Sequence, residues 1–354
     1  MKKILKAIAI LLVIVLLVVG GYLAYVFLSY HRLPDTDESF PLAGDKARTG
    51  EPYDIITWNL GFGAYSADYS FFMDGGTESR ARSGAEAFDN IAHAIGVLQG
   101  EDPQFMLLQE LDIDATRSYH QDEAQQVAAA MPEYQACLAQ NYDSPYLFYP
   151  ITRPHGASKS GILTLSMPAV TRFQRKGLPI ETGFMKFLDL DRCYSICRVP
   201  VENGRELVIY NLHLSAYTSD GTIATEQLEI LTADMLSEYQ AGNYTIAGGD
   251  FNKDLLGNSG EVFGVSSEAF TWAQPLKEGA IPEGLRLVDS LDEENPVPSC
   301  RNADSAYEPG KSFVLTVDGF IVSDNVTVSD CHVIDEAFAS SDHNPVKMTF
   351  ILNE

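Results

Sequence analysis

Apolar positions along this 354-residue chain follow two patterns, one long run near the start and many short runs after it. The long run, residues 7–29, reads AIAILLVIVLLVVGGYLAYVFLS and contains no charge. A helix of about 20 apolar residues crosses a hydrocarbon core of ~30 Å, so the run predicts a membrane-spanning helix. Tyr22, Tyr25 and Tyr30 at its end suit the aromatic belt of a membrane interface.

The short apolar runs after residue 51 predict strands alternating with amphipathic helices. The predicted strands are Ile55–Asn59, Phe105–Gln109, Gly161–Ser166, Tyr194–Pro200, Glu206–Leu214, Tyr244–Ala247, Ser312–Val317, Phe320–Ser323 and Val346–Leu352, and the clearest helices are Arg80–Gln99 and Thr222–Gln240. Asn203-Gly204, between two of these strands, is typical of a tight hairpin. Strand–helix–strand units mixed with hairpins indicate a mixed sheet flanked by helices in one α/β domain.

Charges on either side of the N-terminal run predict its orientation. Lysines precede the run and acids follow it: Lys2, Lys3 and Lys6, then Asp35, Asp37 and Glu38. The positive-inside rule then places the N-terminus in the cytoplasm. A cleavable signal peptide is the alternative, but its apolar region is normally about 7–15 residues long. We expect a cytoplasmic N-terminus (1–6), a transmembrane signal anchor (7–29), a stalk (30–51) and an extracytoplasmic domain (52–354).

The chain is strongly acidic, with a formal net charge of −25. Residues 31–354 hold 21 basic and 49 acidic side chains, which gives that part a net charge of −28. Such a surface repels polyanions and lacks the cationic track on which general nucleic-acid binding depends. A nucleic-acid partner is therefore disfavoured, although clustered acids can equally bind cations.

Five cysteines are too few and too scattered to form a disulfide framework. Cys193 and Cys197 fall in one predicted strand, where about 3.3 Å per residue separates their Cα atoms by roughly 13 Å. A disulfide spans only about 4.4–6.8 Å, so these two are expected as buried free thiols. A bridge between Cys300 and Cys331 is left open.

Polar residues recur at the ends of the predicted strands or inside them. They are Asn59, Glu110, His213, Asp250, Asn252, Asp318, Asp342 and His343. A carboxylate within an apolar run must be paired or bound to a metal, because burying a lone charge is costly. Any one of these residues alone could be a turn former or a satisfied core group, but the ordered set indicates a site.

The side chains of this set favour a hard cation. Oxygen ligands without a Cys/His cluster suit Mg²⁺ or Mn²⁺ rather than zinc. Such an ion neutralises charge on a phosphoryl group, while carboxylates or histidines orient a water. Asp112 and Asp114 could be a further ligand pair, but they lack a calcium-loop glycine and terminal Glu, so we expect them in a solvated loop.

The order of these motifs resembles that of the endonuclease/exonuclease/phosphatase superfamily, which includes deoxyribonucleases, abasic-site endonucleases, neutral sphingomyelinases and inositol-polyphosphate 5-phosphatases. The matching pieces are Trp58-Asn59, Gln109-Glu110, Asn211-Leu-His213, Gly249-Asp250-Phe-Asn252, Val317-Asp318 and Ser341-Asp342-His343. The resemblance covers roughly residues 53–352. It implies a four-layer α/β sandwich, with two mixed β-sheets face to face, helices outside and the active site at one end.

The resemblance also implies roles at an ion site and an attacking water. Glu110 would be the principal metal ligand, with Asn59 and Asp342 helping to build the ion site. Asp250 would orient or deprotonate the water, and Asn252 would hold a phosphate oxygen.

Two histidines complete the implied machinery. His343 would act as acid/base or transition-state stabiliser, held in orientation by Asp318. His213 matches the second histidine of the deoxyribonuclease and sphingomyelinase branches, where it donates to the phosphate or the leaving group. A cation, an oriented water and donors around one phosphorus also agree with the interpretation of the residues themselves.

Two further features bear on the substrate. The segment Gly61–Gly76 carries Tyr65, Tyr69, Phe71 and Phe72, which could line a pocket, touch a membrane or pack as a lid. Beyond Glu110 and before Gly161, the candidate phosphate contacts are Arg117 and Lys159, with Arg80 a weaker one. Ordinary surface charge is the alternative for these basic residues.

Three hypotheses follow for function. The first is an extracytoplasmic, metal-dependent phosphodiesterase or phosphatase acting on lipid headgroups or small phosphoesters. The second is a surface nuclease, which the net charge disfavours, and the third is a non-catalytic binding module. Because no Gly-x-Ser-x-Gly nucleophile motif is present, we expect hydrolysis by direct attack of water. Monoester or diester preference and the oligomeric state are left open.

Overall fold

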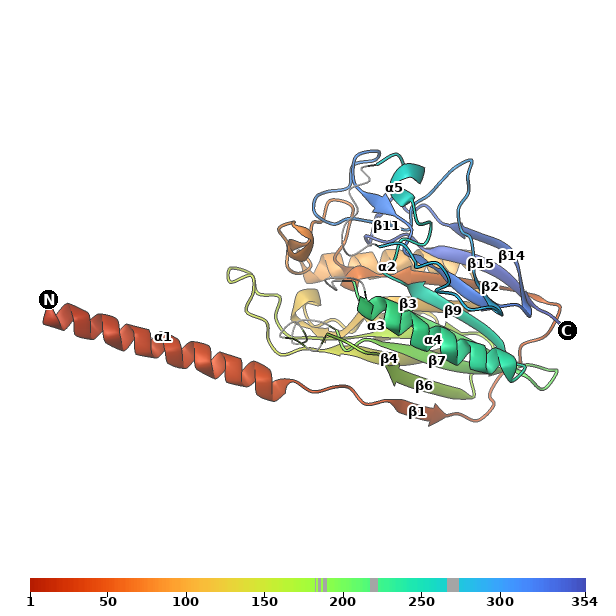
Figure 1. Cartoon of the computed structure of the whole chain (residues 1–354), viewed down its shortest axis with the longest axis horizontal. Coiled ribbons are helices and arrows are strands. Elements are labelled where there is room, and N and C mark those ends of the chain that lie inside the picture. Colours follow the sequence, from red (N-terminus) through yellow and green to blue (C-terminus); the bar gives the residue numbers. More distant parts are fainter. Residues whose placement is uncertain (182, 184–185, 187–189, 217–221, 266–273) are drawn as a thin grey trace.

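The computed structural model describes residues 1–181, 183, 186, 190–216, 222–265 and 274–354. A long N-terminal helix leads into a domain whose two mixed sheets pack face to face, with helices on their outer sides (Figure 1). The expected four-layer α/β sandwich is confirmed.

The larger sheet has seven strands and the facing sheet has six. The larger one runs β1 (Thr36–Ser39), β6 (Arg172–Gly177), β7 (Cys193–Pro200), β8 (Glu206–His213), β9 (Tyr244–Asp250), β13 (Asp318–Ser323) and β10 (Leu285–Leu287). The other runs β14 (Val326–Val333), β15 (Val346–Leu352), β2 (Pro52–Asn59), β3 (Phe105–Ala115), β5 (Ser158–Ser166) and β4 (Gln135–Asp143). A small separate sheet pairs β11 (Cys300–Arg301) with β12 (Val314–Leu315). The pairs β2–β3 and β8–β9 are parallel, so the ends of these strands meet at one edge.

Helices cover the outer faces of both sheets. They are α2 (Gly84–Glu101), α3 (Glu123–Ala130) and α4 (Thr222–Gln240). The short α5 (Ser259–Val262) lies against β12, and the loops contain 3-10 turns η1 (Gly61–Gly63), η2 (Phe72–Asp74) and η3 (Thr116–Ser118). Apolar residues of α2 and α3 pack on the six-stranded sheet, and those of α4 pack on the seven-stranded sheet. Ser83 caps α2 by accepting a hydrogen bond from the Glu86 amide, at 3.1 Å.

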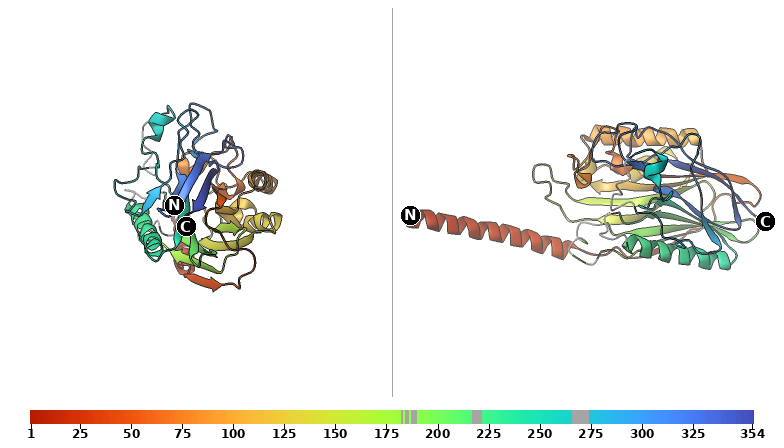
Figure 2. Two further views of the ribbon diagram at one scale, coloured as in Figure 1. Left: turned by 90° about the vertical axis from the view of Figure 1, so that its right-hand side faces the viewer. Right: turned by 45° about the horizontal axis from the view of Figure 1, so that its top comes forward.

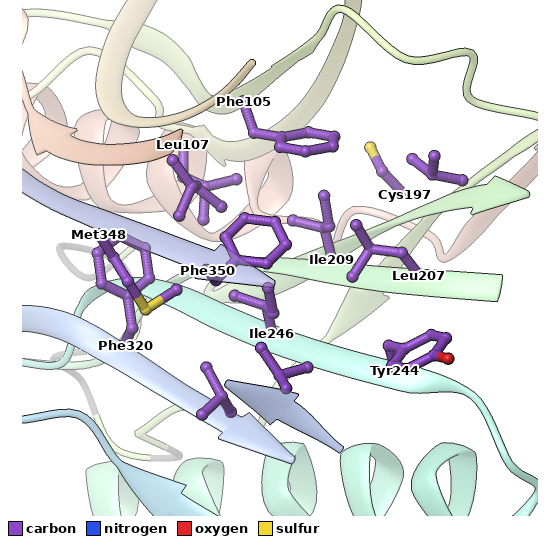
Figure 3. Packing of buried hydrophobic residues seen from close by; sticks show 14 of the residues in the cluster. Phe105, Leu107, Cys197, Leu207, Ile209, Tyr244, Ile246, Phe320, Met348 and Phe350 are labelled. Carbon is purple, nitrogen blue, oxygen red and sulfur yellow. The ribbon is translucent and has the colours of Figure 1, made fainter. Parts of the chain in front are cut away.

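The main core lies between the two sheets, where Phe105, Leu107, Ile209, Ile246 and Phe350 interdigitate (Figure 3). Alternate residues of a strand face opposite sides, so β8 sends Leu207 and Ile209 into this core and Val208 and Tyr210 toward α4. Strands buried on both faces have nearly continuous apolar sequences, which explains why these runs were visible in the sequence.

Helix α1 (Lys2–Ser29) projects away from the domain and is long and apolar enough to span a membrane (Figure 2). The segment 30–51, expected as a stalk, is partly folded onto the domain. Its residues Thr36–Ser39 form β1, paired antiparallel with β6, and Ala47 is fully buried. The open edge of β6 offers unpaired backbone groups, which explains why a polar segment is held there.

Several strand boundaries differ from the predicted ones. Strand β3 continues to Ala115, whereas the strand expected at Ser312–Val317 shrinks to Val314–Leu315. Strands β4, β6 and β14 were not predicted, because their partly exposed residues break the apolar pattern. The Asn203-Gly204 hairpin between β7 and β8 is confirmed, with Gly204 at a φ of 86°.

Candidate active site

The polar residues at the strand ends converge on a cleft of about 140 Å³ at one end of the sandwich. The cleft is lined by the following predicted residues: Glu110, Arg117, His213, Asp250, Asn252, Asp342 and His343. Asn59 and Asp318 lie directly beneath and bond to lining residues. Lys159 is exposed on β5 and does not line the cleft, and Arg80 does not line it either.

Strand register places Asp250 at the centre of the site. In the parallel pair β8–β9, His213 lies opposite Asp250, and in the antiparallel pair β9–β13, Asp318 lies on its other side. The Asn252 amide donates to Asp250 Oδ1 at 2.9 Å, and the Asn252 side chain donates to the Leu214 carbonyl at 2.8 Å. The turn after β9 therefore fixes the Asp250 carboxylate against the cleft.

A glycine is required beside Asp250. A Cβ atom at Gly249 would lie 2.0 Å from the Leu212 carbonyl oxygen of β8. The close approach of the two backbones is what brings Asp250 and His213 together, so the glycine belongs to the construction of the site.

Glu110 reaches the cleft through a β-bulge in β3. The pairing with β5 shifts register between Leu108 and Leu111, and Glu110 has a φ of 55°. A bulge turns a side chain away from the regular alternation, and positive φ at a non-glycine residue is uncommon and strained. Strain held at this position is consistent with a functional demand on the Glu110 carboxylate.

Asn59 bridges two carboxylates at the end of β2. Its amide nitrogen donates to Glu110 Oε1 at 3.3 Å and to Asp250 Oδ2 at 3.1 Å. Its oxygen accepts a hydrogen bond from the Gly61 amide at 3.0 Å. Asn59 therefore sets the relative positions of Glu110 and Asp250.

His343 and Asp318 form a buried dyad. His343 Nδ1 lies 2.7 Å from Asp318 Oδ2, and Ser299 Oγ donates to the same carboxylate oxygen at 2.8 Å. Burial would lower the pKa of His343, but Asp318 and the Cys300 thiol outweigh burial and raise that pKa well above its usual value. The dyad thus presents an imidazolium whose Nε2 lies 3.8 Å from Asp250 Oδ2.

His213 has the opposite electrostatic character. Burial lowers its pKa well below the usual value, and the positive charges of Arg192 and His343 lower it further. Its Nε2 lies 3.4 Å from Asp250 Oδ2 and 3.9 Å from Glu110 Oε1. The site therefore pairs one charged histidine with one neutral histidine.

The cleft carboxylates carry negative charge that the protein does not fully balance. Burial raises the pKa of Asp250 to about 6, although His343 opposes the shift. Burial also raises the pKa of Asp342 to about 7, against His343 and Arg301, with Glu110 adding to the rise. Among the described residues, no ion pair to lysine or arginine joins Asp250, Asp342 or Glu110. Such a cluster fits a divalent cation.

Two groups of side chains could hold that ion. One is the predicted set of Glu110, Asp342 and Asn59. The other comprises Asp250, Asp318 and His343, which each place one ligand atom within 4.8 Å of the other two. In the second group, His343 Nδ1 and an Asp318 oxygen are already engaged with each other.

Arg117 lies at the cleft wall with its charge neutralised inside the protein. Its guanidinium contacts both carboxylate oxygens of Asp112, at 2.8–3.2 Å, and lies 4.0 Å from the centre of the Phe62 ring. The expectation of a solvated loop for Asp112 and Asp114 is wrong, since both lie in β3 and Asp112 is fully buried. The pairing of Asp112 with Arg117 was not predicted, because the expected strand ended at Gln109 and left both residues in a loop.

Other lining residues escaped the sequence analysis. They include Arg192 and Arg301, which are almost fully buried, together with His155, Tyr142 and Cys300. Cys300 Sγ lies 3.6 Å from His343 Nε2. A buried arginine or cysteine has no sequence signature of its own, and only the Ser-Cys-Arg-Asn run at 299–302 marks a polar interruption there.

The aromatic segment after Asn59 is both a packed cluster and part of the cleft wall. Phe62, Tyr65, Tyr69 and Phe71 are buried against one another, and three of them, Phe62, Tyr65 and Phe71, line the cleft. Gly61 permits this turn, because a Cβ atom there would lie 2.7 Å from the Tyr65 ring and 3.1 Å from Asp342 Oδ1.

The cysteines are all free thiols in the structure, including Cys300 and Cys331. Cys193 and Cys197 are buried on β7, as expected.

The same fold occurs in solved structures at low sequence identity. ANGEL2, described as a 2′,3′-cyclic phosphatase in complex with adenosine-2′,3′-vanadate, is 15% identical, with a TM-score of 0.57 over 92% of this chain and 100% of that chain. An endonuclease/exonuclease/phosphatase protein from Beutenbergia cavernae is 16% identical, with a TM-score of 0.56 over 85% and 72%. One from Bacteroides thetaiotaomicron is 14% identical, with a TM-score of 0.54 over 86% and 99%. No family model matches the sequence, and the comparison with curated proteins finds no match.

Proposed function

We propose that this chain, whose structural neighbours are endonuclease/exonuclease/phosphatase proteins, is a membrane-anchored, metal-dependent phosphoester hydrolase. The fold neighbours support phosphoester hydrolysis in general. The observation that carries the proposal is the convergence of Glu110, Asp250, Asp342 and the His343–Asp318 dyad on one cleft.

Glu110 and Asp342, with Asn59 behind them, are the residues that would hold a divalent cation. Among the described residues no lysine or arginine pairs with either carboxylate, and Glu110 is partly open to the cleft. When bound, Mg²⁺ or Mn²⁺ supplies positive charge that polarises a phosphoryl oxygen and neutralises developing negative charge. The buried trio of Asp250, Asp318 and His343 is better used in proton transfer, since His343 and Asp318 already bond to each other.

The remaining residues act on water and on the phosphoryl group. Asp250, ionised above a pH of about 6, accepts a proton from a water held over its carboxylate. His343, kept protonated by Asp318, donates to a phosphoryl or leaving-group oxygen, and Asn252 holds another oxygen. His213 stays neutral and donates a hydrogen bond without adding charge. No nucleophilic side chain is needed, so water attacks phosphorus directly.

Location and substrate follow from the anchor and from charge. Helix α1 and the lysines before it support an extracytoplasmic domain on a single-pass anchor. A net charge of −28 after residue 30 supports a lipid headgroup or a small phosphoester over a nucleic acid.

The test uses the full-length chain in detergent micelles with Mg²⁺ or Mn²⁺. Bis-(p-nitrophenyl) phosphate, sphingomyelin, inositol phosphates and plasmid DNA are compared side by side. Glu110→Ala is the inactive variant, and Asp114→Ala, an exposed carboxylate of the same strand, is its matched control. We expect metal-dependent cleavage of lipid or small esters by the wild type and by Asp114→Ala only.

Each competing function has its own outcome in this assay. Prompt nicking of the plasmid, with lipids and small esters intact, would make the protein a surface nuclease. A binding module would show no difference between wild type and His343→Ala on any substrate. A trapped phosphorylated enzyme would contradict direct attack by water.

A further inference from the structure

The loop between β4 and β5, residues 144–157, exposes an apolar tip. Among the described residues that follow α1, its Ile151, Tyr149 and Phe148 are the three most exposed large apolar side chains, at 86%, 68% and 56%. Single exposed apolar residues need no explanation, but three within four positions mark a surface that is covered in use.

This loop contacts the N-terminal helix. The Tyr22 hydroxyl donates to the Tyr146 carbonyl at 3.1 Å, and the Tyr146 amide donates to the Tyr25 hydroxyl at 3.1 Å. The rings of Tyr22 and Phe148 pack edge to face with centroids 5.2 Å apart. In Figure 1 the loop projects from the end of the sandwich that α1 approaches.

The segment between α1 and β1 is tied to the domain, so the direction of the anchor is set. Arg175, only 3% exposed, donates to the carbonyls of Leu33 and Pro34 at 3.1 and 3.2 Å. Arg32 donates to the Leu178 carbonyl at 2.9 Å and forms an ion pair with Asp191. A domain held this way presents one fixed end to the membrane.

Helix geometry gives the depth of the loop. About 20 residues span a hydrocarbon core of ~30 Å at 1.5 Å per residue, so a core that begins at Ala7 ends near Val26. Tyr22 lies before that boundary, and Phe148 packs on Tyr22. The loop tip therefore lies at the depth of the interface and the outer part of the hydrocarbon.

Residues at both ends of the same loop line the cleft. Tyr142, at the end of β4, and His155, before β5, line it. His155 Nδ1 lies 2.7 Å from the Ser79 carbonyl oxygen, and the Tyr149 ring packs on Phe72 with centroids 5.6 Å apart. The tip that reaches the membrane and the wall of the cleft are thus one continuous piece of chain.

The charge of this region suits a lipid surface. Residues 144–157 contain no acid and one arginine, Arg153, in a chain whose net charge is −25. Anionic headgroups repel acidic segments, so the absence of acids allows this loop to approach a bilayer.

We propose that the tip of loop 144–157 inserts into the leaflet beside α1 and holds the cleft against it, so that the substrate is the phosphoester headgroup of a lipid in that leaflet. The substrate part of this inference rests on the proposed function, and the docking part rests on α1 spanning the membrane. Aromatic and aliphatic side chains at a tip are the residues that bury in the headgroup and acyl boundary.

Tryptophan quenching tests the docking without any activity. Full-length Phe148→Trp is reconstituted in vesicles of phosphatidylcholine and phosphatidylglycerol, with or without bromine on the acyl chains. Met167→Trp is the matched control, because Met167 is 41% exposed just past the other end of β5, about 30 Å along that strand. The wild type, with Trp58 and Trp272, supplies the background. We expect bromolipid to quench the added tryptophan at 148 and to leave that at 167 unquenched.

Hydrolysis by the same reconstituted protein tests the substrate. The double variant Phe148→Ser/Ile151→Ser is compared with Met167→Ser on phospholipid in the vesicles and on soluble bis-(p-nitrophenyl) phosphate. Losing burial of two apolar side chains should lower lipid hydrolysis by about tenfold or more, with hydrolysis of the soluble ester unchanged.

The outcomes separate this inference from the proposed function. Absence of quenching at 148 overturns the docking, whether or not the enzyme is active. Suppose that the tryptophan at 148 is quenched. The proposed substrate class is then overturned if the double variant hydrolyses lipid as fast as the wild type, or if no lipid is cleaved. Failure to cleave both the soluble ester and the lipid overturns the proposed function, while the quenching result still decides the docking.

Discussion

Two groups of buried carboxylates lie close together in this protein and differ in what balances them. Asp112 is held by two guanidinium nitrogens of Arg117, so its charge is neutralised within the chain. Asp250 and Asp342 border the cleft, where burial raises their pKa values to about 6 and about 7. The charge of Asp112 is thus balanced within the chain, whereas Asp250 and Asp342 fit a bound cation.

The contrast extends to a neighbouring glutamate. Burial raises the pKa of Glu123 well above its usual value, and the carboxyl accepts a hydrogen bond from the Asp112 amide at 2.8 Å. Burial therefore favours the neutral form of Glu123 beside the ion pair. A closed network of this kind supports the cleft wall, and the open cluster in the cleft is available for chemistry.

The largest expected effect is on catalysis by the open cluster. Asp250→Asn should lower kcat on bis-(p-nitrophenyl) phosphate by about 10²–10⁴-fold, because the amide cannot accept a proton from water. Circular dichroism and thermal unfolding check that the variant is folded. Activity within a few-fold of the wild type would remove Asp250 from the proposed machinery.

Breaking the closed network should instead cost stability. Asp112→Asn leaves the Arg117 charge buried without its partner, which typically lowers the free energy of unfolding by about 3–5 kcal/mol. Urea denaturation measures the change, and Asp114→Asn on the same strand is the exposed control. The double variant Asp112→Leu/Arg117→Met, which removes both charges, should recover part of the loss. Equal stability of Asp112→Asn and Asp114→Asn would show that the pair is not needed.

The raised pKa of Asp342 should make the stability of the metal-free protein depend on pH. Asp342 has a folded pKa of about 7, above its unfolded value of about 3.9, so the folded state binds more protons between these limits. In metal-free protein this residue therefore makes stability fall as pH rises from about 4 to 7. Asp342→Asn has no carboxylate to ionise, so its stability should not fall over this range. The variant should therefore be more stable than the wild type at pH 8 and equally stable near pH 3.

With Mg²⁺ bound at Glu110 and Asp342, the wild type should instead be more stable than Asp342→Asn. Bound metal stabilises the folded wild type, and the gain should be reduced or lost in Asp342→Asn. Thermal unfolding with EDTA or with Mg²⁺, across the pH range, measures both effects. A metal-induced rise in Tm that is the same in both proteins would exclude Asp342 as a ligand.

The smallest effect is expected at Lys159. Its side chain is exposed on β5 outside the cleft, so Lys159→Met should change stability by less than about 0.5 kcal/mol and leave KM unaltered. Steady-state kinetics on the small ester provides the check. A marked rise in KM would restore Lys159 as a substrate contact.

Much of the sandwich was predictable from the sequence because its central strands are buried on both faces. Strands such as β8 and β9 and the helix α4 appear as uninterrupted or periodic apolar runs. Strands β1, β4, β6 and β14 were missed because exposed or half-exposed positions interrupt their apolar pattern.

The same distinction holds for the site. Glu110, His213, Asp250, Asp342 and His343 could be selected because polar side chains at the ends of apolar strands are conspicuous, and the structure brings them to one cleft. Arg192, Arg301 and Cys300 could not be selected in the same way, since burial of such residues depends on loops that pack from elsewhere.

By itself, the sequence determined which residue types alternate along each strand, where an apolar helix could enter a membrane and which polar groups end the core strands. Those features are local, and they follow from side-chain period and polarity. Only the tertiary structure decided that Arg117 neutralises Asp112, that a bulge turns Glu110 into the cleft and that loop 144–157 lies against α1. These contacts join segments through strand register and loop packing, and no local pattern encodes the distance between them.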